Sequence, residues 1–369
     1  MTADAAIDAV IGLARPEIVA MKPYSSARRE ASSEGVLLNA NEAPRSLVLT
    51  APGEPPLNRY PDPQPGKLLS GLAALYGVPQ DNLLVTRGSD EGIDLLTRVF
   101  CRAGQDAILH CPPTFGMYRI AAQTQGAEVV SVPRSADQDF ALDGDELLRV
   151  LANDPRIRLV FLTSPNNPTG DCVDEALLLK LLDATRESAV VVVDEAYAEF
   201  CQRASAIGLI PSHANLVVLR TLSKAWASAG LRCGAVVAQA PVIDLLRRII
   251  APYPLASPVS ALAERVLRPD MQMRQRELLA ELEDNKRTLL ALLRGRPFIR
   301  EIWPGEANFV LLRVDDSPAL LSHCSRHGVV LRGYPNEPAL EGCIRISVGS
   351  QQDIAALDQA LDAWEEAKP

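Results

Sequence analysis

The sequence lacks several features that would place it in other classes of protein. Its seven cysteines are scattered and odd in number, and no two form a Cys-x-x-Cys pair, which predicts a reduced, cytoplasmic chain rather than a disulfide framework. The first 14 residues have neither a basic start nor a long apolar core, so neither a signal peptide nor a membrane span is expected. Two of the four histidines, His323 and His327, lie beside Cys324. No carboxylate or thiol pattern completes a site around them, so no metal is predicted.

An excess of positive charge is also missing. The chain has 37 Lys and Arg residues against 46 Asp and Glu residues, a net charge of -9. Because a negative surface repels phosphate backbones, nucleic acid is not expected as a partner, and small anions must be bound by local clusters of positive charge. Apolar residues are abundant instead: 47% of the 369 residues are hydrophobic, which is enough for a large core and about two domains.

Strand-like apolar runs alternate with helical patterns between residues 65 and 250. Strands are expected at 83–86, 107–110, 128–132, 158–162, 189–193, 216–219 and 234–238. Continuous β-branched runs alternating with helices are typical of a mostly parallel sheet covered on both faces. The sequence therefore predicts an α/β fold for this region.

The pattern changes after Pro258. A long helix is expected at 269–293, followed by short strands at 307–313, 329–331 and 343–348 and a last helix at 352–367, which together indicate a smaller α+β domain. We predict an N-terminal arm with part of the small domain at 1–60, a large domain at 61–260 and a small C-terminal domain at 261–369.

Polar or aromatic residues follow five of the predicted strands. They are Ser89 with Asp90 and Glu91, Phe115, Asn167, Asp194 and Lys224. In an open α/β sheet, ligands bind outside the carboxyl ends of the strands. A lysine at that place suits covalent capture of a phosphorylated aldehyde, with the phosphate held by nearby hydroxyls and an arginine, here Thr221, Ser223 and Arg232. The alternative is a solvated lysine in a loop.

The other strand-end residues fit pyridoxal phosphate, each with a simpler alternative. Asp194 follows five small apolar residues, where a pyridinium nitrogen would offset its buried charge; alternatively, it caps the next helix. Tyr197 and Asn167 could donate to the phenolic oxygen of the ring, although Asn167 also suits an ordinary Asn-Pro turn. The helix opening at Ser89 offers free N–H groups to an anion or is simply capped. Phe115 could stack on the ring or belong to the core.

Longer motifs carry a family resemblance. Ser-Pro-Asn-Asn-Pro-Thr-Gly at 164–170, Asp-Glu-Ala-Tyr at 194–197 and Ser-Lys-Ala-Trp-Ala-Ser-Ala-Gly-Leu-Arg at 223–232 resemble the fold-type I, PLP-dependent aminotransferases. Further segments are similar to the histidinol-phosphate aminotransferases within that group; they lie at 22–29, 38–42, 59–64, 111–118, 330–332 and 344–349.

The resemblance implies a role for each site residue. Lys224 is expected to be the Schiff-base lysine and the base for the 1,3-proton shift. Asp194 would pair with the ring nitrogen, and Asn167 and Tyr197 would hold the ring oxygen. Phe115 stands where several members of the family have a tyrosine, so it keeps the stacking and loses the hydroxyl.

The same resemblance implies two anion sites. Asp90, Ser223 and Arg232 are expected at the cofactor phosphate, and Tyr60 of the partner subunit would reach it in a homodimer with shared sites. Arg345 would clamp the substrate anion, with Arg332 and Tyr24 beside it, because guanidinium groups match both carboxylates and phosphates. For Arg332 a surface ion pair is the alternative.

The expected activity is amino transfer between L-histidinol phosphate and 2-oxoglutarate, giving imidazole-acetol phosphate and glutamate in histidine biosynthesis. Three alternatives stay open. They are an aromatic amino-acid aminotransferase, an enzyme like threonine-phosphate decarboxylase, and a binding protein of the same fold with little turnover.

Overall fold

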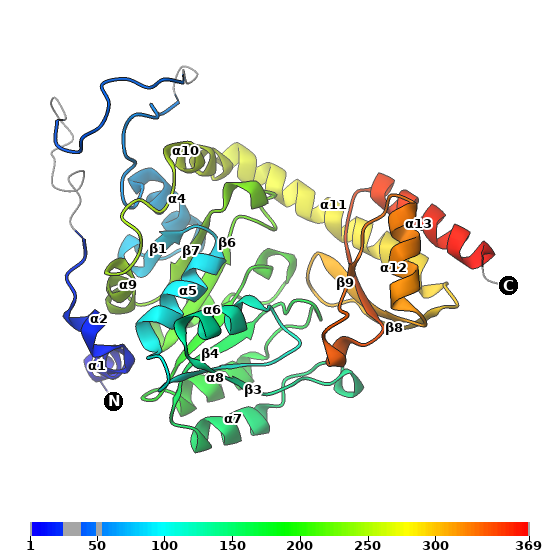
Figure 1. Cartoon of the computed structure of the whole chain (residues 1–369), viewed down its shortest axis with the longest axis horizontal. Helices are drawn as coiled ribbons and strands as arrows, with labels where there is room; N and C mark the ends of the chain where they lie inside the picture. The colour runs from blue at the N-terminus through cyan, green and yellow to red at the C-terminus, as the bar shows by residue number, and fades with distance from the viewer. Residues whose placement is uncertain (1, 25–37, 49–53, 368–369) are drawn as a thin grey trace.

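The computed structural model describes residues 2–24, 38–48 and 54–367. Its strands form two sheets (Figure 1). The larger has seven strands in the order β1-β7-β6-β5-β4-β2-β3, and the smaller has four in the order β10-β11-β9-β8. We call each sheet with the helices packed on it the large lobe and the small lobe.

The predicted mostly parallel sheet is confirmed in the large lobe. Its strands are β1 (Leu83–Thr86), β2 (Ala107–His110), β3 (Glu128–Ser131), β4 (Ile157–Thr163), β5 (Val190–Asp194), β6 (Leu216–Thr221) and β7 (Gly234–Val237). The pairs β2–β3, β2–β4, β4–β5 and β5–β6 are parallel, and only β7 runs against its neighbours. The carboxyl ends of the parallel strands therefore meet at one edge of the sheet.

Helices cover both faces of this sheet. They are α1 (Ala3–Leu13), α2 (Pro16–Ala20), α4 (Gly66–Tyr76), α5 (Ser89–Phe100), α6 (Met117–Gln125), α7 (Gly144–Asn153), α8 (Glu175–Ala184), α9 (Ala240–Arg247) and α10 (Ser257–Val266). Short 3-10 helices are η1 (Gln80–Asn82), η2 (Ala136–Gln138), η3 (Ala198–Phe200), η4 (Ala206–Ser212) and η5 (Ala229–Leu231). Side chains alternate along β5, so Val190 and Val192 join one core and Val191 and Val193 the other. Burial on both sides explains why this strand is apolar throughout.

The small lobe packs three helices on its four-stranded antiparallel sheet. Its strands are β8 (Ile299–Trp303), β9 (Phe309–Val314), β10 (Arg332–Gly333) and β11 (Cys343–Ser347), and its helices are α11 (Pro269–Arg294), α12 (Ser317–Arg326) and α13 (Gln351–Glu366), with η6 (Pro338–Leu340). A separate core fills the lobe and includes Leu289, Leu312 and Leu357. Figure 1 shows α11 leading from α10 in the large lobe to the small sheet.

One predicted strand of the small lobe is wrong. The run at 329–331 ends a helix instead: Gly328 has a φ of 80°, and the N–H of Val329 donates to the carbonyl of Cys324 in α12. This is the usual way in which a left-handed glycine closes a helix. Val330 is 85% exposed, and the strand begins only at Arg332.

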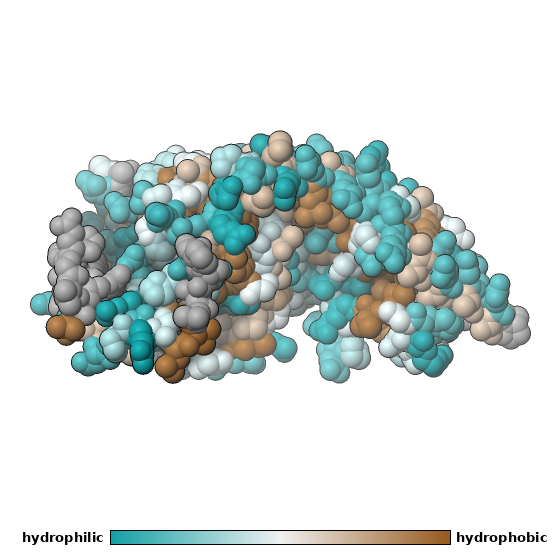
Figure 2. All heavy atoms as spheres, turned by 90° about the horizontal axis from the view of Figure 1, so that it is seen from above, coloured by the Kyte–Doolittle hydropathy of each residue, from teal (hydrophilic) through white to brown (hydrophobic). Residues whose placement is uncertain are grey.

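The lobes meet closely at two glycines. A Cβ placed on Gly305 would lie 2.5 Å from the Cα of Gly170, and the N–H of Glu306 donates to the carbonyl of Gly170 over 2.7 Å. From above, the surface is hollowed between the lobes (Figure 2). None of the helices in the described part of the chain combines the length and apolar character that a membrane crossing requires.

Candidate active site

A cavity of about 580 Å³ collects most of the predicted site residues from both lobes. The large lobe contributes side chains from the loops after its parallel strands, and the small lobe contributes side chains from β10 and β11. The predicted residues that line it are Ser89, Asp90, Phe115, Asn167, Asp194, Tyr197, Thr221, Ser223, Lys224, Arg232, Arg332 and Arg345.

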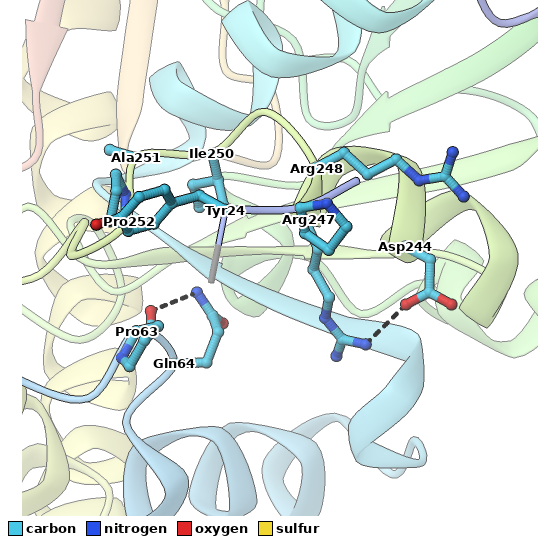
Figure 3. Close-up of a pocket in the computed structure, with 10 residues that line it drawn as sticks. Tyr24, Pro63, Gln64, Asp244, Arg247, Arg248, Ile250, Ala251 and Pro252 are labelled. Atoms are coloured by element: carbon cyan, nitrogen blue, oxygen red, sulfur yellow. Dashed lines mark hydrogen bonds and ion pairs between the residues drawn. The ribbon is translucent and has the colours of Figure 1, made fainter. Parts of the chain in front are cut away.

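Three predicted residues lie elsewhere. Glu91 is the third residue of α5, and its carboxylate turns back to accept the N–H of Arg87 over 2.7 Å, as a capping residue does. Tyr24 lines a different cavity of about 560 Å³ (Figure 3), where Arg247 pairs with Asp244. Tyr60 is 49% exposed and stacks on Tyr253 with 4.6 Å between ring centroids.

One end of the cavity combines a helix N-terminus, hydroxyl groups and an arginine, which are groups that suit an anion. Helix α5 begins after Gly88, which makes no side-chain cap, so the first N–H groups of the helix face the cavity end. Arg232 donates to the Ser223 hydroxyl over 3.2 Å and to Asp90 over 3.0 Å, and Thr221 donates to Ser223 over 2.9 Å. A Cβ on Gly88 would lie 2.8 Å from Arg232 Nη2. Only glycine therefore lets the guanidinium approach the start of the helix.

Asp194 lies buried at the end of β5 and makes no direct ion pair with a cationic side chain in the described part of the chain. Burial raises the pKa of its carboxyl to about 6. Two donors limit that rise: the Tyr118 hydroxyl reaches Oδ2 over 2.8 Å, and the N–H of Ala196 reaches Oδ1 over 3.1 Å. A protonated ring nitrogen would supply the missing positive charge.

Lys224 and Tyr197 stand together beside this carboxylate. The Lys224 ammonium lies 5.6 Å from the centre of the Tyr197 ring. Partial burial, followed by the charge of Arg345, lowers the pKa of Lys224, which favours the neutral, nucleophilic amine. Burial raises the pKa of Tyr197 to about 12, so at neutral pH its hydroxyl keeps the proton and can donate a hydrogen bond.

Two arginines of the small lobe face the same cavity. Arg332 on β10 is the direct cross-strand partner of Arg345 on β11. Arg345 donates to the Asn167 side-chain oxygen, which joins the lobes across the cavity, and its buried Nε has no partner within the described residues. Because like charges directly opposite each other on neighbouring strands are destabilising, the pair suits a bound anion that bridges both groups.

The structure adds residues that the sequence analysis did not assign. Tyr118, three residues after Phe115, reaches Asp194 and stacks on Phe161 with 4.7 Å between centroids. Asn166 is fully buried and donates to the carbonyl of Pro113 over 3.0 Å, which fixes the loop that presents Asn167. Thr114, Thr163, Tyr334 and Glu337 also line the cavity. Only the position of Asn166 beside Asn167 and of Tyr118 three residues after Phe115 could have signalled these roles.

Comparison with known proteins identifies the family. A family model of class I and II aminotransferases matches residues 33–363, so the chain belongs to this family of enzymes.

More specific similarity is to histidinol-phosphate aminotransferases. The protein of that name from Aeromonas salmonicida (strain A449) is 44% identical over 94% of this chain and 96% of its own length. The one from Escherichia coli O45:K1 (strain S88 / ExPEC) is 40% identical over 96% of this chain and 98% of its own. The structure of the Sinorhizobium meliloti enzyme in complex with pyridoxal-5'-phosphate has a TM-score of 0.73 at 22% identity and covers 83% of each chain. The predicted fold-type I architecture is thereby confirmed.

Proposed function

We propose that this protein transfers the amino group of L-histidinol phosphate to 2-oxoglutarate with pyridoxal phosphate as cofactor, giving imidazole-acetol phosphate and glutamate in histidine biosynthesis. The names of relatives that are 40–44% identical over nearly the whole chain support the reaction. The observation that carries the proposal is the facing pair Arg332 and Arg345 in the same cavity as Lys224.

The described residues fit the cofactor. Asp194 is a buried carboxylate with a raised pKa and no direct ion pair in the described ranges, and it would hold the proton on a pyridine nitrogen. The end of the cavity formed by α5, Ser223 and Arg232 suits the cofactor phosphate. When bound, the ring withdraws electrons from the α-carbon of the amino donor. Lys224, with its lowered pKa, would carry the proton between the α-carbon of the amino donor and the aldehyde carbon of the cofactor.

Three further side chains would orient the ring. The Tyr197 hydroxyl and Asn167 would donate to the ring oxygen, and Arg345 fixes Asn167 from the small lobe. Phe115 lines the cavity and meets Tyr118 edge to face, with 5.8 Å between centroids. Phe115 would cover the ring without offering a hydrogen bond.

The two arginines suit both amino donors in turn. Histidinol phosphate presents a phosphate dianion, whereas glutamate presents carboxylates, and guanidinium groups bind both. Arg332 and Arg345 lie on adjacent strands, so one anion can bridge them. The single carboxylate of an aromatic amino acid carries one negative charge, whereas a phosphate dianion carries about two, which matches two guanidinium groups better and favours the phosphate-bearing donor.

Steady-state kinetics test the substrate. We expect kcat/KM to be higher for histidinol phosphate than for phenylalanine or tyrosine, with no carbon dioxide released from phosphothreonine. The variant Lys224→Ala should lose the reaction, whereas Lys67→Ala, which removes an exposed lysine of α4, should keep it. A preference for the aromatic donors, or release of carbon dioxide, would refute the proposed activity.

We also propose a homodimer with shared active sites. Tyr60 lies outside the cavity of its own chain, and the nearby segments expose Leu38 (90%), Leu47 (97%) and Val48 (64%). A second copy would bury these apolar side chains. Mixing Lys224→Ala with Tyr60→Ala tests the arrangement, because a mixed dimer has one site with both lesions and one with neither. Activity should return on mixing; two inactive variants that stay inactive while exchanging subunits would contradict it.

Two further expectations concern the cellular location and the domain boundaries. We propose a cytoplasmic location, supported by seven cysteines that are all free thiols. We also propose the division at 1–60, 61–260 and 261–369, supported by the separate core of the small lobe. The core of the large lobe extends to Leu267, and limited proteolysis would locate the boundary.

A further inference from the structure

Two cysteines and a glutamate meet where the lobes touch. Cys172 Sγ lies 3.3 Å from Cys201 Sγ, and Cys201 Sγ lies 2.8 Å from Glu306 Oε2. One possible ligand atom of each residue lies within 4.8 Å of the others, and none of the three lines the active-site cavity. We propose that these residues form a binding site for a thiophilic divalent cation of the zinc class, separate from the catalytic cavity.

Three distant segments supply the ligands. Cys172 lies between β4 and α8, Cys201 directly follows η3, and Glu306 lies between β8 and β9. The N–H of Glu306 donates to the carbonyl of Gly170 over 2.7 Å, so the contact that joins the lobes also sets the position of the carboxylate. The donor set is therefore in place before a cation binds.

The donor types and spacing favour a cation over a disulfide. Thiolates and carboxylate oxygens are both zinc ligands, and zinc–sulfur bonds of about 2.3 Å in a tetrahedron put two sulfurs about 3.8 Å apart. Cys172 and Cys201 would move apart by about 0.5 Å to reach that spacing. A disulfide would instead bring the sulfurs together by more than about 1 Å.

Neighbouring groups would orient these ligands and balance their charge. The backbone N–H of Arg203 donates to Cys201 Sγ over 3.4 Å, and its guanidinium lies 3.4 Å from Glu306 Oε1. Such outer contacts fix ligand geometry in metal sites. Three anionic ligands around a divalent cation leave one negative charge, which Arg203 offsets. The nearby Lys286 ammonium donates hydrogen bonds to the carbonyls of Gly305 and Ala307 instead.

The site also has an approach for the ion. A third cavity of about 510 Å³ is lined by Cys201, Glu306 and Lys286. It gives an entry path and room for a water molecule as the fourth ligand. Because Glu306 belongs to the small lobe and both cysteines to the large lobe, a bound cation would tie the lobes together and stabilise the folded protein.

Metal uptake by the reduced, chelator-treated holoenzyme tests the proposal. After equilibrium dialysis at micromolar free zinc, we expect one zinc per chain and a higher melting temperature. The double variant Cys172→Ser/Cys201→Ser should lose both effects, and Glu306→Gln should weaken binding tenfold or more. Glu283→Gln, which replaces a carboxylate that lines the third cavity outside the cluster, is the matched control and should bind like the parent.

Cobalt(II) gives a direct readout of thiolate ligation. A sulfur-to-cobalt charge-transfer band should appear in the parent and in Glu283→Gln and vanish in the double variant. Unchanged zinc uptake in the double variant would overturn the site. A reduced parent that takes up no zinc would also overturn it. The same holds if that protein, when treated with an organic disulfide, forms a Cys172–Cys201 bond instead. Should the double variant fail to fold, the affinity of Glu306→Gln, which keeps both thiols, decides the matter.

Discussion

Replacing Tyr118 with phenylalanine would remove one hydroxyl next to Asp194 and leave the aromatic ring in place. That hydroxyl donates to Asp194 Oδ2 over 2.8 Å and contacts Thr163 Oγ1 over 2.7 Å. The ring would keep its stacking on Phe161. Thr163 would keep its contact with Thr114, 3.1 Å away. The substitution therefore isolates the hydrogen bond to the carboxylate.

The size of the effect follows from the charge of the acceptor. A hydrogen bond to a charged group contributes about 1.5–3 kcal/mol, and one pKa unit corresponds to about 1.4 kcal/mol. Losing the donor should therefore raise the pKa of Asp194 by about 1–2 units, from about 6 to roughly 7–8. At pH 7 the carboxylate would change from mostly ionised to half or more protonated, and a protonated ring nitrogen would lose its anionic partner.

The dissociation constant of pyridoxal phosphate, measured from pH 5 to pH 9, reports this change. Binding should weaken in the parent as the pH falls through about 6, because Asp194 then becomes neutral. In Tyr118→Phe the same loss should begin about 1–2 pH units higher. Tyr76→Phe is the matched control, since its buried hydroxyl has no hydrogen-bond partner among the described residues. Coincident profiles for Tyr118→Phe and the parent, with the fold intact, would refute the reasoning.

Four further outcomes are expected. Arg332→Gln should raise KM for histidinol phosphate at least tenfold and change KM for glutamate less, in steady-state assays; equal changes would contradict a role in binding the phosphate. Arg220→Leu leaves the buried Glu195 and the half-buried Glu199 without their cation, so urea unfolding should show a loss of about 3–5 kcal/mol, and a loss below about 1 kcal/mol would argue against the network. Gly305 has a φ of 54° and lies against facing backbone. Gly305→Ala should therefore lower the free energy of unfolding in urea by about 1–3 kcal/mol or more; an unchanged midpoint would contradict this strain. In the apoprotein the folded state holds the Asp194 proton more tightly than the unfolded chain, with a pKa of about 6 against 3.8. Asp194 should therefore contribute a fall of roughly 3 kcal/mol in the free energy of unfolding as pH rises from about 4 to about 6, measured as the difference between the parent and Asp194→Asn; parallel pH profiles would contradict it.

The strands of the large lobe and the residues at their ends were predictable because their signals are local. The five apolar residues before Asp194 mark a buried strand, and a polar residue at the end of a parallel strand must lie at the edge where ligands bind. The same reasoning led to Lys224 and Asn167, which line the cavity. Several helices were not predicted, among them α7 and α12; each has ten residues, so its apolar period repeats only a few times along the sequence.

Glu91 and Tyr60 illustrate where local reasoning stops. Both stand in motifs that suggest a ligand, yet Glu91 turns back to Arg87 and Tyr60 stacks on Tyr253 outside the cavity. The direction of a side chain depends on its place in the first helical turn or on distant neighbours. The role of Tyr60 in a partner's site stays a prediction. The motif segment at 22–29 lies mostly outside the described residues, which include 22–24 of it.

The sequence alone determined the α/β architecture, the lysine and the carboxylate, because each depends on a few neighbouring residues. Only the tertiary structure decided which side chains contact the carboxylate and which side chains meet across the two lobes. Tyr118 lies 76 residues from the Asp194 it contacts, Arg332 faces Arg345 through strand register, and Cys201 meets Glu306 across 105 residues. Contacts of this kind arise when the chain closes long loops and packs two lobes together, and no local pattern of residues specifies their geometry.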